Sequence, residues 1–484
     1  MKFVSTRGGV GLVSFEDALF SGYANDGGLF VPENIPQIPV ETLTSWKNLS
    51  YAEIVEKVVS IFVTEEEIPR KDLKNIISSA FKRFDIDEVI RVASFDDLHI
   101  AELWHGPTMA FKDLAMSVVG EMYRYFLEKR RKNVVVIVGT SGDTGSSAIE
   151  AVRGKENIDI IVILPHNRIS KIQELMMTTV LDDNVHVYAA DGFSDDFEIT
   201  IKNLFNDGKL VKDYNLCSIN SINWGRVMVQ IAHHIYMYLQ VAEPIGKPVD
   251  IVIPTGGCGN IASGVLAQTM GVPVKFACVV NNNDIVHRML RNNDFTVASE
   301  VVQTLACSMD IQIPPNIERV MWIYSGKDFQ ATKEIMQKFD TMGSTSLPKD
   351  LHQKMKENIR TAVVTDEEIV QTMKKCWEEH QYIACPHTCA ALAYHYGISK
   401  YGTRQTTGTK GSDGTLSPSI CVSTASICKF PEILAKAEIE WKEEPKRIKD
   451  LFHKPAKSIV MHKEEDWEQI LRDKISFISQ ARKN

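Results

Sequence analysis

Two glycine-rich loops, each placed between an aliphatic run and a helical pattern, constrain the fold of this chain most strongly. The run Val134–Val138 precedes the loop Thr140–Gly145, and the run Ile251–Pro254 precedes the loop Thr255–Asn260. A short aliphatic run bounded by turn residues is typical of a buried strand. We therefore predict two strand–loop–helix units, each with a helix N-terminus that can bind an anion.

Further aliphatic runs extend these units into sheets. They are Ile158–Leu164, Val185–Ala189, Val274–Val280 and Ile420–Val422. Helical patterns lie between most of them, and this alternation predicts βαβ units with largely parallel strands. The sequence therefore favours an α/β fold, in which ligands bind at the carboxyl ends of the strands.

A chain of 484 residues has room for about two to four domains, at roughly 100–200 residues each. We predict an N-terminal cap (1–92), a smaller α/β domain (93–247), a larger α/β domain (248–430) and a helical C-terminal extension (431–484). In the cap, helices are expected from Ser50 and over Arg70–Phe81. The segment Thr403–Ser417, rich in Thr, Gly and Ser, predicts a flexible surface loop.

The charge balance and the cysteines narrow the class of protein. A net charge of −8 argues against a nucleic-acid surface, because such a surface needs a basic stripe. The nine cysteines form no CxxC pair, which indicates free thiols in a reducing compartment. The first twenty residues lack a sustained apolar core, so we expect no signal peptide, and no apolar run of about 18 residues occurs. We expect a cytoplasmic protein without a membrane segment, and the sequence predicts no oligomeric state.

A single lysine, Lys112, stands within the apolar and turn-forming stretch Leu103–Ala115, ahead of a helical pattern. An amine forms an imine only when it is neutral, and burial among apolar side chains disfavours its charged form. Phe111 and Leu114 supply such surroundings. From composition alone, however, a lysine beside an aspartate such as Asp113 is usually a surface ion pair.

The string from His105 to Asp113, His-Gly-Pro-Thr-Met-Ala-Phe-Lys-Asp, resembles the lysine signature of threonine synthases, which are pyridoxal-phosphate enzymes. The resemblance runs from residues 1–8 to residues 429–430, and it is strongest to the vertebrate threonine synthase-like proteins. It implies a tryptophan-synthase-β-like fold (fold type II), with pyridoxal 5′-phosphate in the cleft between two α/β domains. It also implies that Lys112 is the catalytic residue that carries this cofactor as a Schiff base.

The same resemblance implies further cofactor contacts in two places. The second glycine-rich loop lies where the family holds the cofactor phosphate, and a hydroxyl after the last strand lies where the family contacts the pyridine nitrogen. The residues concerned are Gly256, Gly257, Cys258, Gly259, Asn260 and Thr424. Taken alone, a glycine loop of this kind is often only a tight turn.

Two other stretches resemble the substrate-binding segments of the family. The first glycine-rich loop matches the segment that holds the substrate carboxylate, and Asn220–Arg226 matches the segment that recognises the substrate phosphate. Arginine suits that task because it offers a forked set of donors. The residues implied are Thr140, Ser141, Asp143, Thr144, Asn220, Ser221 and Arg226. Without the resemblance, both stretches have the composition of ordinary helix starts.

Three segments depart from the threonine synthase pattern, and in one of them Cys385 replaces the acid of the family's Asp-Pro-His-Thr segment. Gly257 replaces an asparagine of the phosphate loop, and Ser426 replaces a histidine that precedes Lys429. Cys385–Cys389 contains metal-ligating residue types, but no second Cys/His pair has a spacing suited to zinc, so no metal is expected.

The resemblance, together with the departures at Gly257 and Ser426, implies a phospho-lyase. Such an enzyme eliminates phosphate from O-phosphohomoserine and O-phosphothreonine and gives 2-oxobutyrate, ammonia and phosphate. The vertebrate proteins that the chain resembles are phospho-lyases, and Gly257 and Ser426 replace residues expected of a synthase. Two alternatives remain. One is a threonine synthase, which adds water to form threonine, and the other is a non-catalytic binding protein that keeps the fold.

Overall fold

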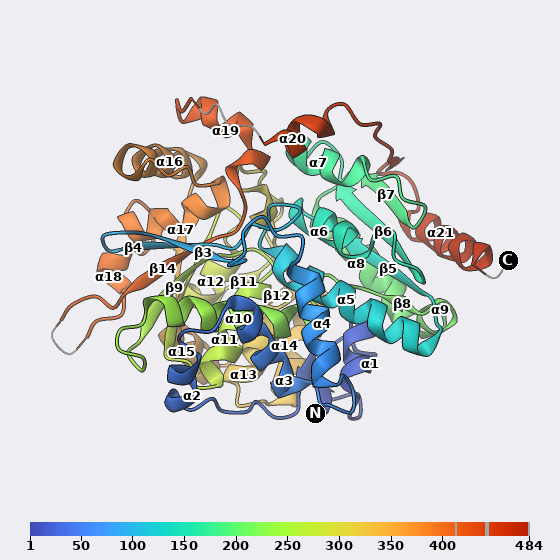
Figure 1. Cartoon of the computed structure of the whole chain (residues 1–484), viewed down its shortest axis with the longest axis horizontal. Coiled ribbons are helices and arrows are strands. Elements are labelled where there is room, and N and C mark those ends of the chain that lie inside the picture. Colours follow the sequence, from blue (N-terminus) through green and yellow to red (C-terminus); the bar gives the residue numbers. More distant parts are fainter. Residues whose placement is uncertain (412–413, 441–444, 483–484) are drawn as a thin grey trace.

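The computed structural model describes residues 1–411, 414–440 and 445–482 (Figure 1). Within these residues the strands form two main sheets and two short antiparallel pairs. The larger sheet has the order β13-β10-β9-β14-β4-β3, and the smaller has the order β15-β7-β6-β5-β8. The two main sheets lie on opposite sides of the molecule, with the smaller one at the upper right of the view (Figure 1).

The larger sheet is parallel except at one edge, where β3 and β4 form an antiparallel pair. Its strands are β13 (Ile359–Val363), β10 (Val274–Val280), β9 (Val249–Pro254), β14 (Ser419–Ser423), β4 (Leu98–Glu102) and β3 (Arg91–Phe95). β9 is buried along its whole length, as expected for a parallel strand covered on both faces.

The smaller sheet is parallel throughout. Its strands are β15 (Ile459–Met461), β7 (Val185–Ala190), β6 (Ile158–Pro165), β5 (Val134–Gly139) and β8 (Leu216–Cys217). The two short pairs are β1 (Phe3–Ser5) with β2 (Phe30–Pro32), and β11 (Phe295–Thr296) with β12 (Ser344–Thr345).

Helices cover both sheets. In the first half of the chain they are α1 (Phe15–Phe20), α2 (Val40–Trp46), α3 (Tyr51–Phe62), α4 (Arg70–Phe81), α5 (Lys112–Arg130), α6 (Asp143–Val152), α7 (Lys171–Thr178), α8 (Ser194–Asn206), α9 (Gly208–Tyr214) and α10 (Trp224–Val241). In the second half they are α11 (Gly259–Thr269), α12 (Ile285–Asn292), α13 (Ile317–Tyr324), α14 (Phe329–Met342), α15 (Lys349–Asn358), α16 (Asp366–His380), α17 (Pro386–Tyr396), α18 (Arg404–Thr407), α19 (Pro431–Lys436), α20 (Lys446–Leu451) and α21 (Trp467–Ala481).

The N-terminal segment packs as helices against the central helix α10. Ser50 caps α3 by accepting a hydrogen bond from the Glu53 backbone, and the Glu53 carboxylate accepts one from the Ser50 backbone in return. α3 buries its apolar face against α10, and the predicted helix Arg70–Phe81 is α4. The sequence pattern therefore identified both helices of this segment.

All six predicted strands form, but two elements differ from the expected layout. β3 and β4 lie at the start of the range 93–247, yet β4 pairs with β14 of the larger sheet. The segment after residue 430 was expected to be helical, yet it contributes β15 to the edge of the smaller sheet. Register and sheet membership depend on distant partners, which local periodicity does not reveal.

The segment Thr403–Ser417 also contains more structure than expected. It holds the short helix α18 and a bridge between Lys410 and Leu416, while residues 412–413 lie outside the described residues.

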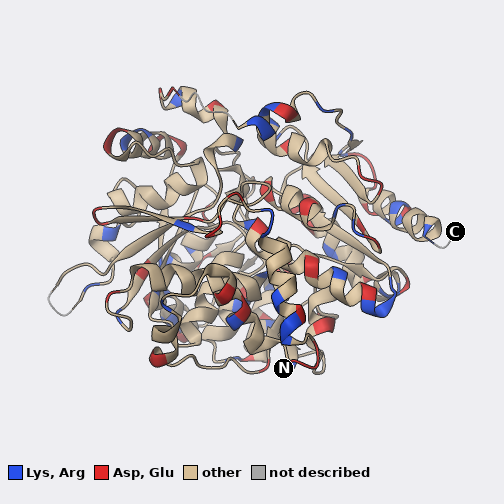
Figure 2. Ribbon diagram, in the orientation of Figure 1, with Lys and Arg blue, Asp and Glu red and all other residues tan. Residues whose placement is uncertain are grey.

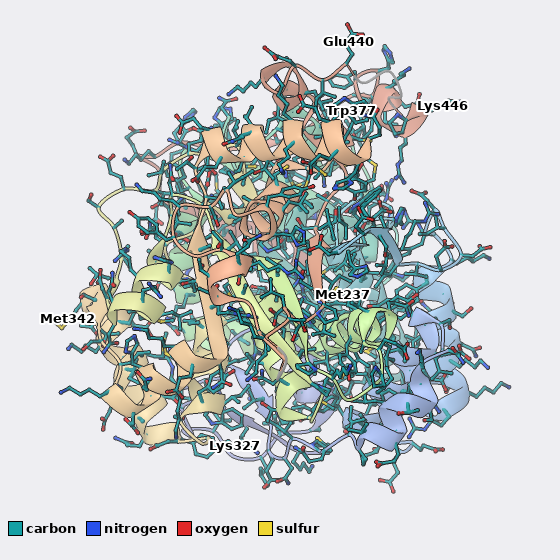
Figure 3. All side chains as sticks on the ribbon, turned by 90° about the vertical axis from the view of Figure 1, so that its left-hand side faces the viewer. Met237, Lys327, Met342, Trp377, Glu440 and Lys446 are labelled. Atoms are coloured by element: carbon teal, nitrogen blue, oxygen red, sulfur yellow. The ribbon has the colours of Figure 1, made fainter. Side chains whose placement is uncertain are left out.

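The distribution of side chains is that of a well-packed protein. Met237 of α10 is fully buried in the interior, whereas Met342 at the end of α14 is 68% exposed and projects from the edge of the molecule (Figure 3). Lys and Arg are interspersed with Asp and Glu along the outer helices in the view of Figure 2. Among the described residues, no helix combines the length and apolar character required to cross a bilayer.

Gly120 sets the distance between α5 and α6. A Cβ atom at this position would collide with the carbonyl oxygen of Ala151 on α6. We therefore predict that Gly120→Ala lowers the free energy of unfolding by about 1–3 kcal/mol through overpacking. Thermal unfolding measures this effect, with Lys129→Ala at an exposed position of the same helix as the control. Equal stability of the two variants would contradict this packing.

Candidate active site

Most of the predicted site residues line one cleft. The loops that follow β5, β9 and β14 open into it, and so does the N-terminus of α5. The predicted residues that line it are Lys112, Ser141, Asp143, Thr144, Ser221, Arg226, Gly256, Gly257, Cys258, Gly259, Asn260 and Thr424. Residues that are far apart in the sequence thus meet at the carboxyl ends of parallel strands, as open α/β sheets lead one to expect.

Lys112 is the first residue of α5, and its side chain is only 13% exposed. Burial lowers the pKa of its amine to about 8, although the nearby carboxylate of Asp143 acts in the opposite direction. The neighbouring Asp113 is not its partner, because it accepts hydrogen bonds from the backbone and the hydroxyl of Thr108 at 2.8 and 2.7 Å. Lys112 is therefore a buried amine within the cleft and not half of a surface ion pair.

A second buried lysine, Lys429, takes the closer place beside Asp143. Its Nζ atom lies 2.6 Å from Asp143 Oδ1, whereas Lys112 Nζ lies 3.8 Å from Asp143 Oδ2. Lys429 also donates to the carbonyl of Thr108 at 2.9 Å, and it is fully buried. Asp143 thus neutralises Lys429 first, and the positive charge of Lys429 further disfavours protonation of Lys112.

Further donors surround the carboxylate of Asp143. Gln173 Nε2 donates to it at 2.9 Å, and the hydroxyl of Ser308 lies 3.4 Å away. Burial alone would raise the pKa of Asp143, but Lys429 and Lys112 together hold it below its usual range. The carboxylate is therefore charged at all physiological pH values.

The loop between β9 and α11 has the shape of an anion cradle. Cys258 adopts φ 62°, so the chain turns sharply and α11 begins at Gly259. A Cβ atom at Gly256 would lie 3.1 Å from the Ser308 carbonyl and 3.2 Å from Met309 Cα, so a side chain there would crowd the loop. Asn260 Nδ2 is buried and has no hydrogen-bond partner among the described residues. The cradle thus presents a donor that an anion would satisfy.

Arg226 faces the same cleft from the first turn of α10. It is 1% exposed, its Nε atom lacks a partner among the described residues, and NH1 donates to the Ile219 carbonyl at 3.3 Å. Burial lowers the pKa of its guanidinium to about 9. Gln230, one turn further along α10, lines the cleft with an unpartnered Oε1 atom. A buried cation without a carboxylate partner is costly, and an anionic ligand would offset that cost.

The loop between β5 and α6 brings three of its four predicted residues to the cleft. Gly142 has φ 139°, and a Cβ atom there would lie 2.5 Å from Gln173 Nε2, so only glycine fits. Thr140 does not line the cleft. Its hydroxyl accepts hydrogen bonds from the backbone N–H groups of Gly142 and Gly145, at 3.0 and 2.9 Å, and so shapes the loop.

Asn220 also lies outside the main cleft. It lines an adjoining hollow together with Asp195 and Glu198, and its Nδ2 atom donates to Glu198 at 3.1 Å. Ser221 lines both cavities. Of the two neighbouring residues, Ser221 is therefore the one placed to contact a ligand in the cleft.

The strand β14 ends beside the cleft at Thr424. The backbone of Thr424 accepts a hydrogen bond from the N–H of Phe111 at 2.8 Å, which ties β14 to the lysine segment. Ser426 lines a different hollow, and its hydroxyl accepts from the N–H of Cys428 at 3.3 Å. Of the positions that depart from the family pattern, Gly257 thus lines the cleft, whereas Ser426 lines a neighbouring hollow.

The segment Cys385–Cys389 serves packing and the cleft wall. Cys385 caps α17 by accepting from the N–H of Thr388 at 3.5 Å, and His387 accepts from the N–H of Ser308 at 3.1 Å. Burial lowers the pKa of His387 to about 4. Among the described residues, no group of three or more His, Cys, Asp or Glu side chains is placed to hold a metal ion.

Sequence reasoning did not include among the site residues four side chains that line the cleft or hold its residues. They are Gln173, Gln230, Ser308 and Lys429. A signal existed for Lys429, because this lysine is retained where the family pattern is otherwise broken at Ser426. Gln173 and Gln230 lie in segments with an ordinary helical pattern. Ser308 lies in the segment Ser308–Ile313, which resembles the family and was expected only to pack or to support the site residues.

The residues of the cleft fit pyridoxal phosphate. An amine whose pKa is lowered to about 8 suits reaction with an aldehyde. The unpartnered donor Asn260 Nδ2 at the glycine loop suits the phosphate group of that cofactor.

The chain matches three family models. They are described as threonine synthase N terminus (residues 2–81), pyridoxal-phosphate dependent enzyme (residues 95–331) and threonine synthase, C-terminal (residues 403–472). Together with the fold, these matches define the chain as a pyridoxal-phosphate enzyme of fold type II.

Full-length relatives identify the family. The chain is 47% identical to threonine synthase-like 2 of Xenopus laevis over 100% of both chains. It is 46% identical to the human protein of that name, over 99% of this chain and 98% of the relative. It is 35% identical to the threonine synthase of Pseudomonas aeruginosa over 96% of each. The pyridoxal-phosphate-bound threonine synthase of Brucella melitensis matches with a TM-score of 0.87 and 31% identity over 99% of both chains. The chain belongs to the threonine synthase family, and the resemblance and fold class expected from the sequence are confirmed.

The lowered pKa of Lys112 predicts how cofactor uptake depends on pH. Because only the neutral amine reacts, the rate of uptake by cofactor-free protein should rise with pH and level off above about pH 8. Asp143→Asn removes the charge that raises this pKa, so the midpoint should move to lower pH. Visible absorbance of the bound cofactor, followed in stopped-flow, gives the midpoint.

Lys429→Met provides the opposite test. Without Lys429, Asp143 pairs with Lys112 and stabilises its charged form, so the midpoint should move to higher pH. Breaking a buried ion pair also costs stability, about 3–5 kcal/mol, which thermal unfolding reports separately. Midpoints that stay unchanged in both variants would contradict the proposed charge arrangement.

Proposed function

We propose that this chain is a phospho-lyase that eliminates phosphate from O-phosphohomoserine and O-phosphothreonine. The products are 2-oxobutyrate, ammonia and phosphate. The observation that carries the proposal is Lys112, a buried amine whose pKa is lowered to about 8. It lies in the same cleft as a glycine loop and the Arg226 guanidinium, which has no carboxylate partner in the part of the chain that the structure describes. This combination supplies a base for carbon acids and donors for anions.

The cofactor would be held by residues from three parts of the chain. Lys112 would bind it covalently, and the segment Gly256–Asn260 would bind its phosphate through backbone N–H groups and the Asn260 amide. Thr424 would contact the pyridine nitrogen. A neutral hydroxyl need not keep that nitrogen protonated, which suits elimination. When bound, pyridoxal phosphate supplies an aldehyde for the amine and a ring that takes up electrons from the substrate.

The remaining steps fall to side chains of the chain itself. Lys112 Nζ would accept the proton from the substrate Cα, because the lowered pKa leaves about half of the amine neutral near pH 8. Ser141 and Thr144 would bind the substrate carboxylate at the N-terminus of α6. Arg226 and Ser221 would bind the substrate phosphate and favour its departure as an anion. With phosphohomoserine, a second proton must leave Cβ before phosphate leaves Cγ, and a proton must then return to Cγ, which becomes the methyl group of the product.

Release of the unsaturated product is favoured over addition of water by two residues. Gly257 has no side chain with which to position water, although a Cβ atom there would make only ordinary contacts, at 3.7–3.8 Å. Ser426 is turned toward the backbone of Cys428 and lines a neighbouring hollow. The released product then hydrolyses to 2-oxobutyrate and ammonia without further help from the protein.

Product analysis decides between lyase and synthase. The purified protein should convert O-phosphohomoserine to 2-oxobutyrate and phosphate in equal amounts, with no threonine beyond background. Lys112→Ala should abolish turnover while the thermal midpoint stays close to that of the unmodified protein. Threonine as the main product would favour the synthase. A protein that takes up no cofactor would favour the binding-protein alternative.

Arg226→Gln tests the phosphate assignment. Loss of a hydrogen bond to a charged group costs about 1.5–3 kcal/mol, so kcat/KM for O-phosphohomoserine should fall by roughly 10–100-fold. Turnover of serine, which carries no phosphate, should change little. An equal loss on both substrates, accompanied by weaker cofactor binding, would assign Arg226 to the cofactor phosphate instead.

A further inference from the structure

The hydroxyl of Ser221 receives a hydrogen bond from a residue with no assigned role. Asn316, just before α13, donates from Nδ2 to Ser221 Oγ at 3.0 Å. Asn316 is fully buried, whereas Ser221 is half-buried and lines the cleft. Ser221 itself lies between β8 and α10, so the bond joins two segments distant in the sequence.

Arg319 determines which way the Asn316 amide points. Its NH1 group donates to Asn316 Oδ1 at 2.5 Å, and its other N–H groups donate to the carbonyls of Phe30 and Ile222. A guanidinium can only donate, so the atom of Asn316 that faces it must be the oxygen. The NH2 group is therefore directed to the opposite side, toward Ser221.

Both protons of that NH2 group have acceptors. One lies toward Ser221 Oγ, and the other toward the carbonyl of Gly257 at 3.3 Å. The backbone N–H of Asn316 donates to the same carbonyl at 3.2 Å. A flipped amide would place NH2 against the guanidinium and its oxygen against the Gly257 carbonyl, and it would lose both of those bonds, so the guanidinium fixes the orientation.

A hydroxyl carries one proton, and Ser221 uses its oxygen to accept from Asn316. Its own proton is therefore left for an acceptor on the cleft side. Arg226 lines the same cleft. A Cβ atom at Gly257 would lie 3.7 Å from Ser221 Oγ, so the absence of a side chain at Gly257 leaves space beside the hydroxyl.

We propose that Asn316 is a positioning residue that makes Ser221 an obligatory hydrogen-bond donor to the phosphate of the substrate. Arg319 acts one step further back, by holding Asn316 in the required orientation. The chain of donors Arg319, Asn316 and Ser221 thus selects a ligand group that only accepts, which a phosphate dianion does. This inference rests on the proposed phospho-lyase function.

Asn316→Asp tests the proposal with little change in shape. A carboxylate can still accept from Arg319, but it also accepts the Ser221 proton, so the hydroxyl no longer donates into the cleft. We expect kcat/KM for O-phosphohomoserine to fall about 10–100-fold, the loss typical of a hydrogen bond to a charged group. The ratio of kcat/KM for O-phosphohomoserine to that for serine should fall by the same factor, because any loss of cofactor binding through the Gly257 carbonyl affects both substrates alike.

A double-mutant cycle separates this effect from the added negative charge. In a Ser221→Ala background, Asn316→Asp should cost much less than it does in the unmodified protein, because the hydroxyl through which it acts is gone. A charge effect alone would cost the same in both backgrounds and would overturn the proposal. If Asn316→Asp fails to fold, Ser221→Ala alone must still lower the preference for phosphorylated substrate, and a retained preference would overturn the proposal.

Asn184→Asp is the matched control. Asn184 is a buried asparagine whose Nδ2 donates to the carbonyls of Val152 and Ile158, away from the cleft. Asn184→Asp should lower the thermal midpoint without changing the substrate preference.

Different results would refute the proposed function and the proposed role of Asn316. An unmodified protein with no preference for phosphorylated amino acids refutes the proposed function, whereas a preference that survives Asn316→Asp refutes the role of Asn316.

Discussion

The ion pair between Lys429 and Asp143 is the interaction on which the cleft depends. Lys429 follows β14 of the larger sheet, and Asp143 begins α6 beside the smaller sheet, so the pair joins the two halves of the molecule. Both side chains are buried, and such a pair is stable only with further hydrogen bonds. Thr108 and Gln173 provide them.

The pair also determines the chemistry of the neighbouring lysine. Without Lys429, the carboxylate of Asp143 would stabilise the charged form of Lys112, whose amine lies 3.8 Å away. With Lys429 in place, burial dominates and the pKa of Lys112 falls to about 8. Lys429 is thus the charged partner of Asp143, and Lys112 is left as the reactive amine. The same arrangement of excess positive charge suits a cleft that holds a phosphorylated, negatively charged substrate.

The sequence predicted the elements better than their partners. The aliphatic runs that became β5, β6, β9 and β10 were evident because buried parallel strands are apolar on both faces. The edge strand β15, with two of its three residues exposed, carries no such signal. The roles of Lys112 and of the phosphate loop were predicted because short sequence motifs around them resemble those of the family. The roles of Lys429 and Asn316 depend on contacts between distant segments and required coordinates. Thr140 was predicted to bind substrate because it belongs to a matching motif. Its hydroxyl instead accepts hydrogen bonds from the loop backbone and does not line the cleft.

The most direct test asks which of the two buried lysines carries the cofactor. Borohydride reduction of the protein loaded with pyridoxal phosphate fixes the cofactor to its amine, and peptide mass spectrometry locates the modified residue. The charge arrangement predicts modification of the peptide that contains Lys112, with Lys429 unmodified. Cofactor fixed to Lys429, or to neither residue, would contradict the account.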